Sequence, residues 1–134
     1  MAAGLGTRLR PLTYEVPKPM VPVGNRPVLE LILRLLAGQG FTDVISNLHW
    51  FPETIRERIG DGSAFGLELT YSFEEELLGT AGGVRNVRDF FGSDPFVVLA
   101  GDALTDVDMR ALAEAHDAHA VSYTHLTLPT IYSV

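Results

Sequence analysis

The chain has 134 residues, of which 46% are hydrophobic, no cysteine, and a formal net charge of -7. This length supports one globular domain with a core but not two, and the missing cysteines exclude disulfides and thiolate metal sites. The acidic balance argues against a nucleic-acid partner, and no apolar run reaches the roughly 20 residues of a membrane span, so we expect a cytoplasmic protein without a membrane partner.

Helical and strand patterns alternate along the chain. Apolar residues at helical spacing predict a helix over residues 28–36, and a strand is predicted over 41–48. A helix over 52–60 follows, with Pro52 in its first turn and Gly60 at its end. Alternating polar and apolar residues then predict a half-buried strand over 67–73, and 81–92 is predicted to be helical.

The continuous apolar run PFVVLAG, residues 95–101, predicts a central parallel strand. A helix is predicted over 108–120, with Asp108 as its N-cap. Strands and helices that alternate over short connections predict an α/β fold with a doubly wound, mainly parallel, Rossmann-like sheet. In such folds ligands lie at the carboxyl ends of the strands.

The first 26 residues are basic although the whole chain is acidic. They contain one acidic residue, Glu15, and four basic residues, Arg8, Arg10, Lys18 and Arg26. A small polyanion is attracted to such a local positive field. Lys18 is the only lysine of the chain and lies between two prolines, which favour an extended backbone.

The stretch GLGTR near the N-terminus has two glycines two positions apart, which lets backbone amides approach an anion closely. Thr7 adds a hydroxyl, and Arg8 adds a guanidinium fork suited to phosphate oxygens. A plain tight turn is the alternative interpretation. The stretch lacks the third glycine of a dinucleotide-binding loop and the Gly-Lys-Ser/Thr of a P-loop.

Together with PKPMVPVGNRPVLE, the stretch GLGTRLRPLT resembles the signature of the sugar-phosphate nucleotidylyltransferases, which include mannose-1-phosphate guanylyltransferases and glucose-1-phosphate thymidylyltransferases. The segments EEELLGTAGGV and VLAGDALTDVD resemble two further motifs of that family, in the same order. On this resemblance, residues 1–117 are identified as a partial nucleotidyltransferase domain. The implied reaction joins a nucleoside triphosphate to a sugar 1-phosphate and releases pyrophosphate.

The resemblance also implies the roles of particular residues. Arg8 would steady the β- and γ-phosphates, and Lys18 would bind the α-phosphate and the incoming sugar phosphate. Asp102 matches the family's first Mg²⁺ ligand, a role that suits a carboxylate because Mg²⁺ is held by few carboxylates plus substrate phosphates; a turn or cap is the alternative. The implied nucleotide-binding positions are Ala3, Gly4, Gly6, Thr7, Gly79 and Thr80.

The same resemblance bears on both ends of the chain. Family members have a short hydrophobic strand before the AAG of this motif, and Met1 takes the place of its last residue. The second Mg²⁺ carboxylate and most sugar-binding residues lie beyond residue 117. We therefore expect an N-terminal fragment, with the first strand and the C-terminal part missing and with little or no activity. As a partner of the intact parent enzyme we expect, besides its substrates, a further copy of itself in a homo-oligomer.

Residues 118–134 contain no Asp, Glu, Lys or Arg. An edge strand with a loop is one interpretation. We favour a non-native tail, because the segment resembles translated adaptor sequence, and we assign it no function.

Several alternatives stay open. LLGTAGG favours a mannose-1-phosphate guanylyltransferase, with a glucose-1-phosphate thymidylyl- or uridylyltransferase as the alternative. A non-catalytic, nucleotide-binding regulatory relative ranks second and a dinucleotide-dependent oxidoreductase third. Residues 74–76 are either a solvated run of glutamates or a contact to base or sugar, and we expect His49 and Trp50 to serve packing.

Overall fold

The structure is a computed structural model that describes residues 1–119 and 121–125. Three one-turn 3₁₀ helices, Thr7–Leu9, Leu12–Tyr14 and Lys18–Met20, open the chain, and a fourth is Ser63–Phe65. A short antiparallel pair, β1 (Pro22–Val23) and β2 (Arg26–Pro27), follows the first three. The remaining elements are α1 (Val28–Gly38), β3 (Asp43–Leu48), α2 (Pro52–Ile59), β4 (Glu68–Phe73), α3 (Gly79–Asn86), α4 (Arg88–Phe91) and α5 (Met109–His119).

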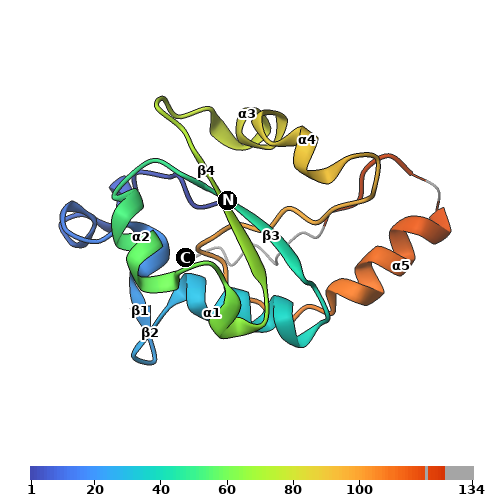
Figure 1. Cartoon of the computed structure of the whole chain (residues 1–134), viewed down its shortest axis with the longest axis horizontal. Helices are drawn as coiled ribbons and strands as arrows, with labels where there is room; N and C mark the ends of the chain where they lie inside the picture. The colour runs from blue at the N-terminus through green and yellow to red at the C-terminus, as the bar shows by residue number, and fades with distance from the viewer. Residues whose placement is uncertain (120, 126–134) are drawn as a thin grey trace, which may run out of the picture.

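Strands β3 and β4 form a parallel pair, with Asp43 opposite Glu68 and Leu48 opposite Phe73 (Figure 1). Helix α2 connects them, because two parallel strands cannot be joined by a tight turn. Pro52 opens this helix, and Gly60, at a φ of 70°, ends it. This β-α-β unit confirms the α/β class and the parallel strand direction.

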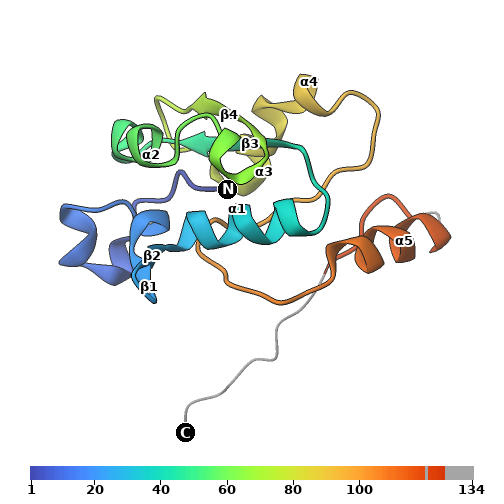
Figure 2. The same cartoon turned by 60° about the horizontal axis from the view of Figure 1, so that its bottom comes forward.

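Helix α1 packs beneath the two strands, on one side of the sheet (Figure 2). Its apolar stripe matches the helical period, since Leu29 and Leu33 are both buried. Leu48 at the end of β3 and Ile55 in α2 are each 0% exposed. The core cluster consists of Ala2, Met20, Leu29, Leu33, Leu48, Ile55, Ile59, Leu67 and Leu69.

The expected strand over 95–101 is wrong as an assignment, because this segment forms no continuous ladder. Two hydrogen bonds nevertheless give it a strand-like contact. The N-terminal ammonium of Met1 donates to the Leu99 carbonyl at 2.8 Å, and the Gly101 amide donates to the Met1 carbonyl at 2.7 Å. When one residue bonds through its N–H and its carbonyl to two residues that lie two positions apart, the contact has the hydrogen-bond pattern of parallel strands. Residues 95–98 have no such partner among the described residues.

A cavity of about 470 Å³ lies between β3, α1, α3, α4 and the segment 94–101. Ser46 of β3 borders it, and its buried hydroxyl is the one buried side-chain polar atom without a hydrogen-bond partner among the residues described. The sheet is therefore interrupted between β3 and the segment 95–101.

The helix expected over 81–92 is two helices, α3 and α4. Val87, with φ -110° and ψ 15°, leaves helical geometry between them. The N-cap prediction for Asp108 is confirmed, because its Oδ1 accepts the amides of Arg110 and Ala111 at 2.9 Å each. Residues 120 and 126–134 of the proposed non-native tail lie outside the described residues.

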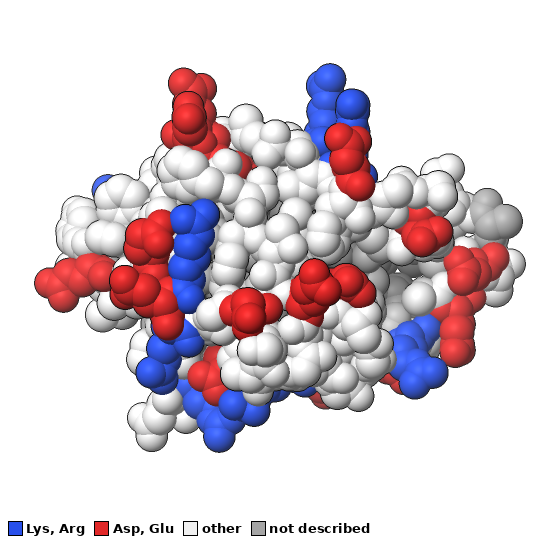
Figure 3. All heavy atoms as spheres, in the orientation of Figure 1, with Lys and Arg blue, Asp and Glu red and all other residues white. Residues whose placement is uncertain are grey.

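Among the helices described, none is long and apolar enough to cross a membrane. On the face in Figure 3, separate acidic and basic groups are scattered among mostly uncharged atoms, and some acidic groups lie close to the middle of the face. The net charge of -7 is thus not collected into one patch on this face.

Candidate functional site

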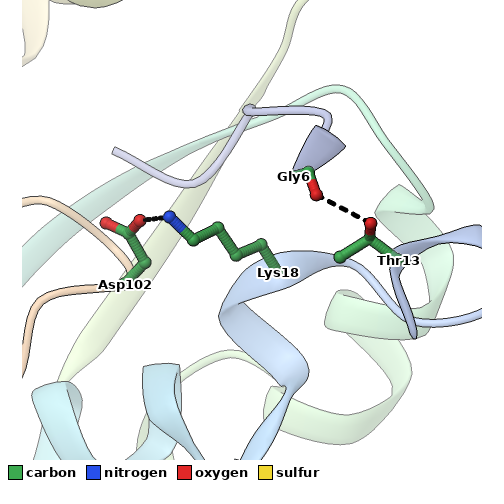
Figure 4. Close-up of polar contacts among 4 residues, drawn as sticks. All are labelled: Gly6, Thr13, Lys18 and Asp102. Carbon is green, nitrogen blue, oxygen red and sulfur yellow. Dashed lines mark hydrogen bonds and ion pairs between the residues drawn. The ribbon is translucent and has the colours of Figure 1, made fainter. Parts of the chain in front are cut away.

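Lys18 and Asp102 meet at a cavity of about 260 Å³ formed mainly by the N-terminal segment. The Lys18 ammonium donates to Asp102 Oδ2, and the two side chains point toward one another in Figure 4. The residues that line this cavity are Met1, Ala2, Gly4, Gly6, Thr7, Arg8, Leu9, Lys18, Pro19, Gly101 and Asp102. Six of the sequence-predicted positions thus lie together around one cavity.

The glycine-rich loop turns at Gly6, whose φ of 62° favours glycine. A Cβ at this position would lie 2.7 Å from Thr13 Cγ2 and 3.1 Å from Lys18 Cβ, so space also requires glycine. The Gly6 carbonyl accepts the Thr13 hydroxyl at 2.8 Å (Figure 4) and the Leu9 amide at 2.9 Å. These bonds hold the one-turn helix Thr7–Leu9 against the cavity.

Asp102 reaches the cavity because Gly101 packs directly against the start of the chain. A Cβ on Gly101 would lie 2.5 Å from the Met1 carbonyl oxygen, a distance that real Cβ atoms do not reach. Only glycine therefore permits the close contact that brings Asp102 beside Lys18.

The remaining predicted positions do not line the cavity. Ala3 is buried, at 5% exposure, between Ala2 and Gly4 in the chain. Gly79 and Thr80 open α3 and are exposed, with Gly79 at a φ of 70°. The structure thus brings Arg8, Lys18 and Asp102 to one cavity, whereas it leaves the predicted base-side pair outside its lining.

A buried hydrogen-bond network links the glycine-rich loop to the segment that precedes α3. The Ala2 amide donates to Asn47 Oδ1 at 2.7 Å, and Asn47 Nδ2 donates to Glu74 Oε1 at 2.8 Å. Glu74 Oε2 accepts the Leu78 amide at 3.2 Å. Glu74 is 3% exposed, so it differs from the exposed Glu75 in the same run. No local pattern distinguishes one glutamate of such a run from its neighbours.

Burial lowers the pKa of the Met1 ammonium, and the nearby Glu74 carboxylate partly opposes this shift.

The packing expected of His49 and Trp50 includes specific polar contacts. A ring nitrogen of His49 lies 2.8 Å from the Glu74 carbonyl, and the Trp50 indole N–H donates to the Thr13 carbonyl at 3.0 Å. Both residues follow the carboxyl end of β3.

Within residues 1–119 and 121–125, no cluster of three or more His, Asp or Glu side chains could hold a metal ion. Among the described residues that line the cavity, Asp102 is the one with a carboxylate. A single carboxylate fits Mg²⁺ when substrate phosphates supply further oxygen ligands, since this small, hard ion also retains several waters.

Curated relatives resemble this chain over most of its length. A uridylyltransferase for UTP and glucose 1-phosphate from Synechocystis is 39% identical over 95% of this chain and 36% of its own. An N-acetylmuramate α-1-phosphate uridylyltransferase from Neisseria meningitidis is 42% identical over 83% and 48%. A mannose-1-phosphate guanylyltransferase from Mycobacterium tuberculosis is 39% identical over 92% and 34%. The chain thus spans about a third to a half of these relatives.

Solved structures have the same fold. One described as a glucose-1-phosphate thymidylyltransferase from Bacillus anthracis matches with a TM-score of 0.81 and 29% identity, over 87% of this chain and 48% of its own. HddC from Yersinia pseudotuberculosis, in complex with GMP-PN, matches with a TM-score of 0.77 and 29% identity, over 86% and 51%. The model of the nucleotidyl transferase family matches residues 1–133. The chain therefore belongs to the nucleotidyl transferase family.

Proposed function

We propose that this chain binds the triphosphate in an enzyme that transfers a nucleoside monophosphate from a nucleoside triphosphate to a sugar 1-phosphate. The observation that supports this most directly is the meeting of Lys18 and Asp102 at the cavity bordered by the glycine-rich loop and Arg8. Backbone amides, two cations and one carboxylate form a suitable set of groups for a triphosphate with its metal ion.

The reaction needs little covalent chemistry from the protein. A phosphate oxygen of the sugar 1-phosphate attacks the α-phosphorus in line, the bond from that phosphorus to its bridging oxygen breaks, and pyrophosphate leaves. Arg8 would offset the charge on the departing phosphates. Lys18 would exchange its carboxylate partner for a phosphate oxygen, so that its charge counters the negative charge at the reacting phosphorus.

Asp102 is the residue that would hold Mg²⁺, the ion that we propose as cofactor. Bound by Asp102 and the substrate phosphates, it would supply positive charge to the triphosphate. Lys18 lies close enough to neutralise Asp102 in the free chain.

We favour mannose 1-phosphate and GTP as substrates, because LLGTAGG resembles the guanylyltransferases and several of the similar curated proteins are named as such. UTP and glucose 1-phosphate are the alternative substrates, because uridylyltransferases are also among the relatives.

Calorimetric titration of the whole chain with GTP, UTP and dTTP, each with Mg²⁺, tests this proposal. We expect GTP to bind most tightly. Lys18→Ala and Arg8→Ala should each weaken binding about ten- to a hundredfold, because each removes a charge-assisted hydrogen bond. Arg58→Ala is the control, since Arg58 is exposed and lies outside the cavity lining.

Two outcomes decide between the alternatives. Pyrophosphate release with mannose 1-phosphate that disappears in Lys18→Ala would assign the transfer step to this chain. Triphosphate binding that is insensitive to both Lys18→Ala and Arg8→Ala would overturn the proposed site.

A further inference from the structure

Thr13 is almost completely buried, at 1% exposure, although its neighbours Leu12 and Tyr14 are 61% and 58% exposed. Its hydroxyl bonds to an earlier residue of the chain, and its carbonyl bonds to a later one. The hydroxyl donates to the Gly6 carbonyl at 2.8 Å, and the carbonyl accepts the Trp50 indole N–H at 3.0 Å. One residue therefore connects the glycine-rich loop to the residue that follows β3 by two positions.

The position of Trp50 is well defined because the strand that precedes it is held in the sheet. Strand β3 is paired with β4 along its whole length, and its last residue, Leu48, is 0% exposed. Phe51 adopts a left-handed φ of 49°, and its ring packs edge-on against the Trp50 ring at 4.8 Å between centroids. The indole N–H is thus directed from the sheet toward Thr13.

Neither Thr13 nor Trp50 lines the cavity at Lys18 and Asp102. Both can act on a ligand only through the glycine-rich loop. The methyl group of Thr13 lies against Gly6, since a Cβ added there would be 2.7 Å from Thr13 Cγ2. The hydroxyl and the methyl together determine where the Gly6 carbonyl lies, and hence where the amides of residues 7–9 lie.

We propose that Thr13 and Trp50 are positioning residues, which hold the glycine-rich loop against the carboxyl end of β3 with its amides in place for a triphosphate. The identity of the ligand rests on the function proposed above. The positioning itself is a property of the free chain, because every contact that defines it is present without a ligand.

Hydrogen exchange of the free chain tests the positioning. Thr13→Val keeps the shape of the side chain and removes the hydroxyl, and Trp50→Phe keeps an aromatic ring and removes the N–H. Each should speed exchange of the Leu9 and Arg10 amides, which donate to the Gly6 and Thr7 carbonyls, at least about threefold, as expected for the loss of one net hydrogen bond. Exchange in β3 and β4 should stay unchanged. Thr13→Ser, which retains the hydroxyl, should exchange more slowly than Thr13→Val.

Titration with GTP and Mg²⁺, at a temperature where every variant is folded, measures the consequence for binding. Thr13→Val and Trp50→Phe should weaken affinity about three- to tenfold, whereas Thr70→Val, at an exposed position of β4, should not change it. Trp50 is the only tryptophan, so its emission reports directly on loop contacts in the Thr13 variants.

The outcomes separate the two proposals. Unchanged exchange of the Leu9 and Arg10 amides in both Thr13→Val and Trp50→Phe overturns the positioning role. Faster exchange with unchanged affinity also overturns it, because the loop would then bind without being held. If the unaltered chain binds no nucleoside triphosphate, the proposed function fails, and faster exchange in the variants still supports the hydrogen-bonded link.

Discussion

The side chains of Lys18 and Asp102 are separated by 84 positions in the sequence and form an ion pair at one cavity. They are 27% and 33% exposed, so water and salt screen their attraction. Pairs of this kind contribute at most about 1 kcal/mol to stability. The pair therefore matters chiefly because it keeps two opposite charges where a phosphate and a metal ion can use them.

Asp102→Asn should separate metal binding from folding. We expect the free energy of unfolding to change by less than about 1 kcal/mol, because the ion pair is screened. The affinity for GTP should depend less on Mg²⁺, since the carboxylate that would hold the ion is gone and only the substrate phosphates would still bind it. Titrations in Mg²⁺ and in EDTA measure this, with the exposed Asp106→Asn as control. Full Mg²⁺ dependence in Asp102→Asn would remove Asp102 from the metal site.

Gly6→Ala and Gly4→Ala should have different effects on stability although both positions line the same cavity. At Gly6 the φ is 62° and the new Cβ would meet Thr13 Cγ2 at 2.7 Å, so we expect a loss of about 1–3 kcal/mol. At Gly4 nothing lies within 4 Å, and the change should stay within about 0.5 kcal/mol. Urea denaturation measures both. Equal losses at the two positions would contradict the left-handed turn at Gly6.

The local patterns predicted the helices and strands that have clear ends. Pro52 and Gly60 delimit α2, and Asp108 caps α5, because these signals act within one turn of the chain. The meeting of Lys18 and Asp102 at one cavity follows from the motif resemblance, not from any local pattern. The structure places both side chains in the lining of that cavity, and the roles implied for them stay predictions.

What the sequence could not predict depends on contacts between distant segments. PFVVLAG is apolar enough for a strand, but its hydrogen bonds depend on a neighbour, and in the described residues only Met1 pairs with it. Likewise, Glu74 is buried because Asn47, 27 positions earlier, donates to it. The contact of Trp50 with Thr13 spans 37 positions. Such contacts have no periodicity that a sequence pattern could reveal.

Gly83→Ala and Gly38→Ala are the same substitution in two helices. They should change the free energy of unfolding in opposite directions. A Cβ at Gly83 would lie 2.8 Å from Glu74 Oε1 and 3.1 Å from Asn47 Nδ2, so it would disturb the buried network at a cost of about 1–3 kcal/mol. At Gly38, in the last turn of α1, nothing lies within 4 Å. Alanine there should stabilise by about 0.4–1 kcal/mol. Thermal and urea unfolding of both variants show whether each substitution raises or lowers the free energy of unfolding. A stabilising Gly83→Ala would show that the network tolerates rearrangement.

The ionisation of the Tyr71 phenol at high pH tests the packing around the parallel strands. Burial raises the pKa of its phenol from the usual 10.0 to about 12, with Arg56 opposing and Asp61 reinforcing the shift. The hydroxyl donates to the Gly60 carbonyl at 2.7 Å. Because the folded chain holds this proton more tightly than the unfolded chain, the contribution to stability is present below about pH 10 and is lost as the pH rises toward 12.

Ultraviolet titration of the phenolates measures this shift directly. One of the four tyrosines should ionise near pH 12, and Tyr71→Phe should remove that transition. Arg56 lies over the Tyr71 ring at 5.9 Å, so Arg56→Ala should raise the pKa further, whereas Arg58→Ala, in the same helix, should leave it unchanged. A late transition that survives in Tyr71→Phe would assign it to another tyrosine and would contradict the burial of the Tyr71 side chain at the end of α2.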